Sequence, residues 1–197
     1  MTPNRRAPRT VAALLVAVAL AFPAAAQTNR TSANRVSIDN FGRISANYFR
    51  GAQPQGGDYA DLRGLGVKTI IDLTQDGDVS EAGVVKGLGM KFFRIPMTTR
   101  VTPTAQQIQQ FLTIVNDPAN QPVYVHCQGG RHRTGVMTAI YRMTDEGWTA
   151  DRAFAEMKRF KFGADFLHPE FKKFVYAYHP AAPAAPPTVL ATTVPAK

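Results

Sequence analysis

Short apolar runs rich in β-branched residues alternate along this chain with segments whose apolar positions recur every three or four residues. Residues 67–73 form such a run, which is typical of a buried strand, and similar runs at 48–50, 90–96 and 123–125 predict three more strands. Strands that alternate with helices indicate an α/β fold. We expect a single domain with a central, mostly parallel sheet flanked by helices.

Helices are predicted in the segments between these strands. The strongest pattern follows Thr102-Pro103, where we expect the threonine to cap a helix and the proline to take its first position. The apolar side chains of this helix form one stripe, made of Ile108, Phe111, Leu112 and Val115. The other helices are expected at residues 58–65, 79–88, 134–145 and 169–178, and in a segment capped by Thr149 with Ala153, Met157 and Phe160 on one face.

The first 26 residues have a different pattern. Three arginines and no acid precede an apolar run at residues 11–22, and a stretch of alanines ends at Ala26. A basic start, a short apolar core and small residues before a cleavage point are typical of a secretory signal peptide. The run is short for a membrane span. We expect cleavage near Ala26, a periplasmic or secreted location, and no membrane span in the mature chain.

These patterns divide the 197 residues into four parts. After the signal peptide, residues 27–42 are a polar N-terminal segment and residues 43–179 are the folded domain. Residues 180–197 are almost only Pro, Ala, Thr and Val, a composition that cannot build a core, so we expect a disordered tail. We expect a monomer.

The charge balance favours anionic partners. The whole chain carries 23 basic and 14 acidic residues, a formal net charge of +9. Removing three arginines with residues 1–26 leaves 20 basic and 14 acidic residues, a net charge of +6. The basic residues are scattered, with no run of five and no interleaved aromatics, so nucleic acid is not an expected partner.

The sequence HCQGGRHRTG, residues 126–135, holds the only cysteine. It follows a predicted strand and leads into a predicted helix. Backbone N–H groups at such a junction can form an anion nest, and the helix N-terminus adds positive potential. We expect Gly129 and Gly130 to supply the unusual backbone angles that a nest requires. The segment therefore predicts a phosphate-binding loop.

Each side chain of this loop has a chemical use. Arg133 can hold two phosphate oxygens at once, and the positive surroundings favour the nucleophilic thiolate of Cys127. Thr134 can donate its hydroxyl to the sulfur when it leaves, and His126 is expected to be buried and hydrogen-bonded, fixing the loop. The expected substrate contacts are Gln128, Gly129, Gly130, Arg131, His132 and Arg133.

The pattern Cys-x5-Arg-Thr-Gly resembles the signature of the cysteine-dependent protein tyrosine phosphatase superfamily. The flanking segments RGAQP (50–54), KTIIDL (68–73) and GMKFFRIPM (89–97) are similar to its compact dual-specificity branch, including plant and fungal atypical enzymes and their bacterial relatives. The resemblance covers residues 43–178. It implies hydrolysis of phosphotyrosine, phosphoserine or phosphothreonine esters through a phosphocysteine intermediate, with no cofactor and no metal.

The general acid is where the chain departs from this family. The family usually supplies an aspartate from the loop after the strand that ends near Pro96, but residues 97–101 hold no acid. His132, which can titrate near neutrality, and Asp78 are level candidates, with Asp76 behind them. A phosphoanhydride substrate, such as an inositol pyrophosphate, would need no acid because its leaving group is already good.

Several functions therefore stay open. Arg131 and His132 make the rim basic, which favours an inositol polyphosphate or pyrophosphate phosphatase as the alternative to a protein phosphatase. A sulfurtransferase of the rhodanese type also places a cysteine in a cradle loop, although the Arg-Thr-Gly ending favours phosphate. A non-catalytic phosphate-binding module is the remaining alternative, and the presence of both Cys127 and Arg133 argues against it.

Overall fold

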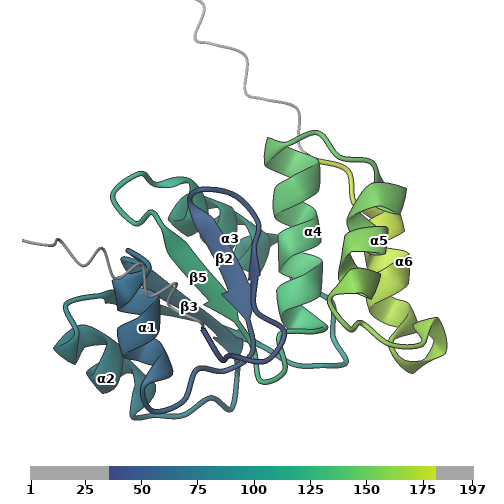
Figure 1. Cartoon of the computed structure of the whole chain (residues 1–197). Coiled ribbons are helices and arrows are strands. Elements are labelled where there is room, and N and C mark those ends of the chain that lie inside the picture. The colour runs from purple at the N-terminus through teal and green to yellow at the C-terminus, as the bar shows by residue number, and fades with distance from the viewer. Residues whose placement is uncertain (1–35, 181–197) are drawn as a thin grey trace, which may run out of the picture. The chain divides into compact units, whose positions relative to one another are not determined.

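A five-stranded sheet organises residues 36–180, the part of the chain that this computed structural model describes (Figure 1). The strand order is β1-β2-β5-β3-β4, and every pairing except β1–β2 is parallel. The predicted fold class is confirmed. The signal peptide, residues 27–35 of the N-terminal segment and the tail beyond Pro180 are predictions that lie outside the described residues.

The four predicted strands are present, with small shifts at their ends. The strands are β1 (Gly42–Arg43), β2 (Tyr48–Gly51), β3 (Thr69–Thr74), β4 (Lys91–Met97) and β5 (Val123–His126). All residues of β2, β3 and β5 are buried, as expected of the inner strands of a parallel sheet that is covered on both faces. The two-residue strand β1, which pairs antiparallel with β2, was not predicted.

Helices cover both faces of the sheet. They are α1 (Asp58–Gly64), α2 (Glu81–Gly87), α3 (Ala105–Asn116), α4 (Arg133–Asp145), α5 (Ala150–Arg159) and α6 (Pro169–Ala177), with a short 3-10 turn η1 (Asp165–Leu167) before α6. Figure 1 shows α1 and α2 on one side and α4, α5 and α6 on the other. Each side has its own apolar core, the larger one beneath α3 to α6. No helix of the described residues is long and apolar enough to cross a bilayer.

The predicted start of α3 is wrong by two residues. Thr104, not Thr102, is the N-cap, and Pro103 lies before the helix. The Thr104 hydroxyl accepts a hydrogen bond from the backbone of Gln107, while the Gln107 side chain accepts one from the backbone of Thr104. Two threonines flank the proline, and only Thr104 has a glutamine three residues later to complete this reciprocal cap.

The packed region begins before Arg43, where the domain was expected to start. Ile38 is buried in the smaller core, and Phe41 packs against it. The other predicted boundaries fall in or beside residues outside the described range, and they stay predictions.

Strand register brings three segments to one level of the sheet. His126, the last residue of β5, lies opposite Gly51 on β2 and Asp72 on β3. The chain leaves all three parallel strands near this level, at their carboxyl ends. In open α/β sheets this edge is where ligands bind. Cys127, the next residue after His126, therefore lies between the segments that follow β2 and β3.

Candidate active site

The loop between β5 and α4 forms a cup with Cys127 in it. Cys127 is only 3% exposed. It lines a hollow of about 220 Å³ together with Thr99, Gln128, Gly129, Arg131, His132 and Arg133. Five of the six predicted substrate contacts thus share one hollow with the thiol. The sixth, Gly130, is buried and does not line it.

Gly130 is the glycine on which the loop conformation depends. Its φ is +62°, in the left-handed region that favours glycine. A Cβ at this position would lie against the backbone carbonyl of Gly51 and 2.7 Å from the amide nitrogen of Ala52. Gly129 has no positive φ, and a Cβ there would meet only the Arg131 side chain, at 3.6 Å. The expectation of unusual backbone angles is therefore confirmed for Gly130 and wrong for Gly129.

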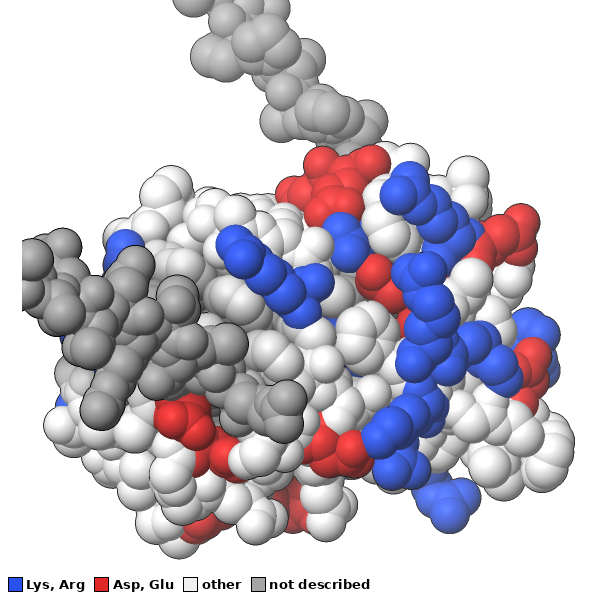
Figure 2. Space-filling view, viewed as in Figure 1, with Lys and Arg blue, Asp and Glu red and all other residues white. Residues whose placement is uncertain are grey.

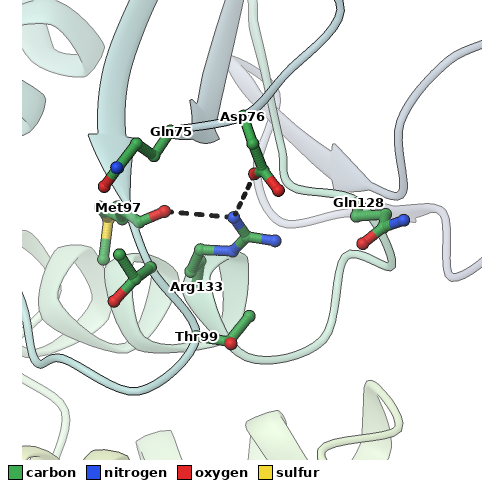
Figure 3. A pocket seen from close by; sticks show the side chains of 7 residues that line it. Gln75, Asp76, Met97, Thr99, Gln128 and Arg133 are labelled. Carbon is green, nitrogen blue, oxygen red and sulfur yellow. Dashed lines mark hydrogen bonds and ion pairs between the residues drawn. The ribbon is translucent and has the colours of Figure 1, made fainter.

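Arg133 projects from the first turn of α4 into a second, adjoining hollow (Figure 3). This hollow measures about 300 Å³ and is lined by Gln75, Asp76, Met97, Thr98, Thr99, Gln128 and Arg133. One guanidinium nitrogen of Arg133 donates to the carbonyl oxygen of Met97 at 3.2 Å. The Nε atom is buried and has no hydrogen-bond partner among the described residues. The guanidinium is thus held in place with donors left for an anion.

The hydroxyl of Thr134 also lacks a hydrogen-bond partner among the described residues. Thr134 is fully buried at the start of α4. An unpaired buried hydroxyl costs stability. That cost is consistent with the predicted role at the sulfur of Cys127, a role that stays a prediction.

The structure separates the three candidate acids. Asp76 lines the Arg133 hollow, and its Oδ1 lies 3.8 Å from Nη1 of Arg133. The carboxylate of Asp78 instead accepts hydrogen bonds from the backbone and hydroxyl of Ser80, both at 2.8 Å. These bonds hold the pKa of Asp78 below its usual value, which disfavours proton donation.

His132 lines the Cys127 hollow, but its Nε2 is engaged outside it. Its Nε2 lies 3.0 Å from the carbonyl oxygen of Phe162, and its ring centroid is 3.7 Å from that of His168. Burial, followed by the nearby charge of His168, lowers the pKa of His132, so the neutral ring is favoured at pH 7. The geometry therefore favours Asp76, the candidate that the sequence ranked last.

Comparisons with known proteins identify the family to which this chain belongs. Residues 20–171 match the model of a family described as "DSP-PTPase phosphatase fused to NAD+ Kinase". The chain belongs to this phosphatase family. The resemblance to the cysteine-dependent dual-specificity phosphatases is confirmed.

Two curated relatives belong to bacteria and yeast. The chain is 30% identical over 159 residues to the dual specificity protein phosphatase TpbA of Pseudomonas aeruginosa, covering 78% of this chain and 72% of that protein. It is 29% identical over 130 residues to the inositol diphosphatase SIW14 of Saccharomyces cerevisiae, covering 63% of this chain. The chain spans 46% of the yeast protein and 56% of the TpbA from a second strain.

Solved structures agree with the fold. The core catalytic domain of the yeast PP-IP phosphatase SIW14, crystallised with citrate, superposes with a TM-score of 0.64 at 26% identity, covering 72% of this chain and 87% of that one. The crystal structure of TpbA from P. aeruginosa gives a TM-score of 0.62, covering 72% and 86%.

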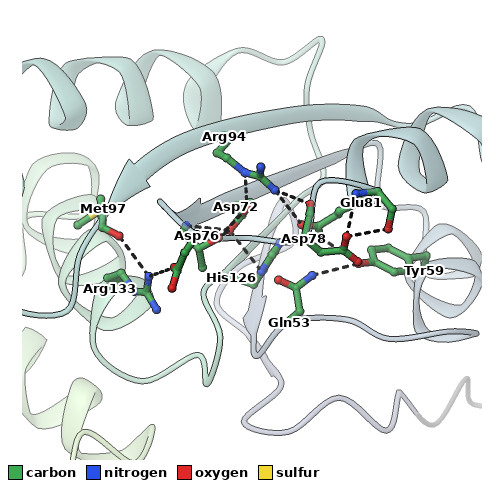
Figure 4. Close-up of polar contacts among 12 residues, drawn as sticks. Gln53, Tyr59, Asp72, Asp76, Asp78, Glu81, Arg94, Met97, His126 and Arg133 are labelled. Atoms are coloured by element: carbon green, nitrogen blue, oxygen red, sulfur yellow. Dashed lines mark hydrogen bonds and ion pairs between the residues drawn. The ribbon is translucent and has the colours of Figure 1, made fainter.

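Behind the loop, the chain buries a polar cluster that the sequence did not predict (Figure 4). His126 is fully buried as expected, with its Nε2 3.0 Å from Glu81 and its Nδ1 4.0 Å from Asp72. The expected hydrogen bond is absent, because neither ring nitrogen has a hydrogen-bond partner among the described residues. Tyr59 donates to Glu81 at 3.1 Å. Glu81 opens α2, 45 residues before His126, and no local pattern connects the two.

The cluster of Asp72, Glu81 and His126 has the ligand types of a metal site. However, both oxygens of Asp72 already accept hydrogen bonds from Thr74, and Arg94 donates to Oδ2 at 2.7 Å. A divalent ion would have to displace these donors and lie beside a guanidinium. The arrangement fits a support for the loop better than a cation site.

The rim beyond the cup is basic on one side. Arg131 is half-exposed, with its guanidinium 3.7 Å from the carboxylate of Asp39. Lys161 also contacts Asp39, at 2.5 Å. Figure 2 shows Lys and Arg side chains gathered over the face that carries α4 and α5. Several exposed basic residues lie on α5 and just after it, namely Arg152, Lys158, Arg159 and Lys161.

Proposed function

We propose that the chain is an exported cysteine-dependent phosphatase that hydrolyses phosphate monoesters through a phosphocysteine intermediate. The observation that carries this proposal is the shared hollow, in which the buried thiol of Cys127 lies with Arg133 and the loop residues between them. A thiolate in a cup of positive charge and backbone donors suits in-line attack on a phosphoryl group.

The first step transfers the phosphoryl group to sulfur. Sγ of Cys127 attacks phosphorus, the P–O bond to the leaving group breaks, and the leaving oxygen takes a proton from the general acid. Arg133 and the loop amides hold the non-bridging oxygens while charge develops on them. In the second step water attacks phosphorus and returns a proton to the acid. The S–P bond breaks, and Thr134 donates its hydroxyl to the departing thiolate.

Asp76 is the general acid in this scheme. Its carboxylate shares the Arg133 hollow and lies on the segment that follows β3. Asp76 is 90% exposed, so its side chain is free to turn from Arg133 to the leaving group when phosphate takes its place on the guanidinium. His132 and Asp78 are the alternatives, but Nε2 of His132 and Oδ1 of Asp78 are engaged elsewhere.

A second candidate substrate is an inositol pyrophosphate. The segment between β4 and α3 places Thr98 and Thr99 in the lining of the Arg133 hollow and carries no carboxylate. A phosphoanhydride has a good leaving group, so it tolerates the absence of an acid there. Arg131 supplies a further cation on the rim for a highly charged substrate. The yeast relative is named as an inositol diphosphatase.

Export is proposed from the sequence of residues 1–26. The working form would then begin near Gln27 and act in the periplasm or outside the cell. Expression of the full chain, with N-terminal sequencing of the protein recovered from periplasm and cytoplasm, tests this. A mature N-terminus near residue 27 supports export, and an intact N-terminus confined to the cytoplasm contradicts it.

Phosphate release by residues 27–197 under reducing conditions tests the function. The substrates are an aryl phosphate, phosphotyrosine, phosphoserine and phosphothreonine peptides, inositol hexakisphosphate and a diphosphoinositol polyphosphate, with Cys127→Ser as control. Turnover of the esters that disappears in Cys127→Ser supports the main proposal. Release from the diphosphoinositol compound alone moves the assignment to the pyrophosphatase. Binding of phosphate without any release would leave a phosphate-binding module.

A further inference from the structure

The carbonyl groups of the phosphate loop are held from outside by the N-terminal part of the domain. The backbone N–H of Gln53 donates to the carbonyl oxygen of Gln128 at 3.2 Å. The side-chain amide of Asn40 donates to the carbonyl oxygen of Gly130 at 2.8 Å and lies 3.4 Å from that of Gly129. In a trans peptide the N–H points opposite to the C=O. Carbonyls fixed outward therefore leave the next amides facing the cup.

Arg50 makes the most unusual of these contacts. It is fully buried at 0% exposure, and its Nη2 donates to the carbonyl oxygen of Gly130. Its guanidinium carbon lies 4.1 Å from the centre of the Phe160 ring, a cation–π contact. Nε and Nη1 have no hydrogen-bond partner, and no carboxylate of the described residues lies within ion-pair distance. Burying a cation without a counter-ion lowers the stability of the fold, so the presence of Arg50 here indicates a functional role.

The anion that fits this cation is the phosphoryl group that the proposed reaction brings into the cup. Burial lowers the pKa of Arg50, while the negative form of Cys127 is among the charges that raise it. A guanidinium stays protonated even when buried. Its positive charge therefore lies behind the loop on which a phosphoryl group would be held.

Asn40 holds a strained backbone to make its contacts. Its φ is +57°, a left-handed conformation that is uncommon outside glycine. The same side-chain amide donates to the carbonyl oxygen of Phe160 at 2.9 Å, so it ties the loop to the end of α5. Strained conformations persist where the surrounding structure uses them.

We propose that Asn40 and Arg50 are positioning residues of the phosphate loop. Together they hold the carbonyls of Gly129 and Gly130 outward so that the loop amides face the phosphoryl group, and Arg50 supplies the buried counter-charge for that group. This inference rests on the proposed function, because it requires that the Cys127 loop binds phosphate.

The test measures the inhibition constant of orthovanadate and the KM for an aryl phosphate in the mature protein. Asn40→Gly removes the amide donors while keeping the left-handed backbone. Arg50→Met removes the charge, and Arg50→Lys retains it without the planar fork. Arg43→Met, an exposed arginine on β1 of the same hairpin, is the matched control. Both constants are independent of the fraction of folded enzyme, so a loss of stability alone leaves them unchanged.

We expect Asn40→Gly to raise the vanadate constant about tenfold, as for the loss of a hydrogen bond that orders an anion site. We expect Arg50→Met to raise the vanadate constant about 100-fold, because the loop is no longer held in position and the buried charge is missing. Arg50→Lys, which keeps the charge, should recover part of the lost affinity. Arg43→Met should match the wild type. If Arg50→Met does not fold, the vanadate constants of Asn40→Gly and Arg50→Lys test the positioning role.

Two negative results have different meanings. Wild-type constants in Asn40→Gly and Arg50→Lys, with or without a lower melting temperature, would overturn the positioning role while leaving the phosphatase intact. A wild-type protein that neither turns over substrate nor binds vanadate would overturn the proposed function itself.

Discussion

The guanidinium of Arg133 lies 3.8 Å from the carboxylate of Asp76, and the two side chains line one hollow beside Cys127. They come from different elements, the first turn of α4 and the segment after β3. The register of the parallel strands β3 and β5 brings them to the same edge of the sheet. A candidate phosphate-binding cation and a candidate proton donor therefore share one hollow at this edge of the sheet.

Replacing Asp76 tests the assignment of the acid. Asp76→Asn should lower kcat for esters with poor leaving groups, such as phosphoserine peptides, about 100-fold, because the leaving oxygen then departs without a proton. An aryl phosphate with a strongly acidic phenol should lose much less. Asp78→Asn is the matched control, and steady-state rates of phosphate release give the comparison. An equal loss for both leaving groups, or a larger loss in Asp78→Asn, would reject Asp76.

The uncommitted hydroxyl of Thr134 predicts a change in the rate-limiting step. Thr134→Val removes a buried hydroxyl that has no partner among the described residues, so the melting temperature should stay level or rise. Breakdown of phosphocysteine should slow about tenfold or more, because the departing thiolate loses its hydrogen bond. Stopped-flow measurement should then show a burst of phenol equal to the enzyme concentration. A less stable variant that shows no burst would indicate that Thr134 contributes to packing and not to the breakdown of phosphocysteine.

The two glycines of the loop should differ in their tolerance of a side chain. Gly130→Ala places a Cβ against the backbone of Gly51 at a positive φ, and strain of this kind costs about 1–3 kcal/mol. We expect lower stability and weaker vanadate binding. Gly129→Ala meets only the flexible Arg131 side chain, so it should remain close to the wild type in both. Denaturant unfolding and vanadate titration measure the stability and the vanadate affinity of the two variants. Equal losses in Gly129→Ala and Gly130→Ala would contradict the loop geometry.

His132 predicts a pH dependence of stability. Burial and His168 hold its pKa below the ordinary value of 6.5, with Arg131 and Arg133 acting in the same direction. The unfolded chain therefore binds the proton first as the pH falls. The free energy of unfolding should be largest above pH 6.5 and should fall as the pH drops from there toward the lowered pKa.

His132→Gln removes the titrating imidazole. The free energy of unfolding should then depend less on pH between pH 6.5 and the lowered pKa of His132. His179→Gln, an exposed histidine after α6, is the control. Urea unfolding at a series of pH values measures the difference. The same slope in wild type and His132→Gln would show that His132 does not titrate abnormally.

The sequence predicted the parts of this molecule that depend on local patterns. The β-branched run of β3 and the Cys-x5-Arg-Thr-Gly loop were both recognised because burial and turn chemistry act over a few neighbouring residues. The sequence ranked His132 and Asp78 above Asp76, whereas the geometry favours Asp76. The Ser80 hydrogen bonds to Asp78 and the contact of His132 with Phe162 depend on side-chain placement, which no local pattern shows.

The supports of the loop could not be predicted for a related reason. Asn40 lies 90 residues from Gly130, and Arg50 lies 80 residues from it. Glu81 likewise meets His126 across the sheet edge. Arg50 opens the segment RGAQP, but its contact with the loop has no local signal, and nothing around Asn40 or Glu81 distinguishes them from surface polar groups. The strand order β2-β5-β3 brings these segments together.

Rapid quenching of the mature protein with an aryl phosphate, followed by mass spectrometry of its peptides, looks for the intermediate itself. We predict a phosphoryl group on Cys127, formed at the rate of the burst and absent in Cys127→Ser. Turnover that persists in Cys127→Ser, or a phosphoryl group on another residue, would contradict catalysis by this cysteine.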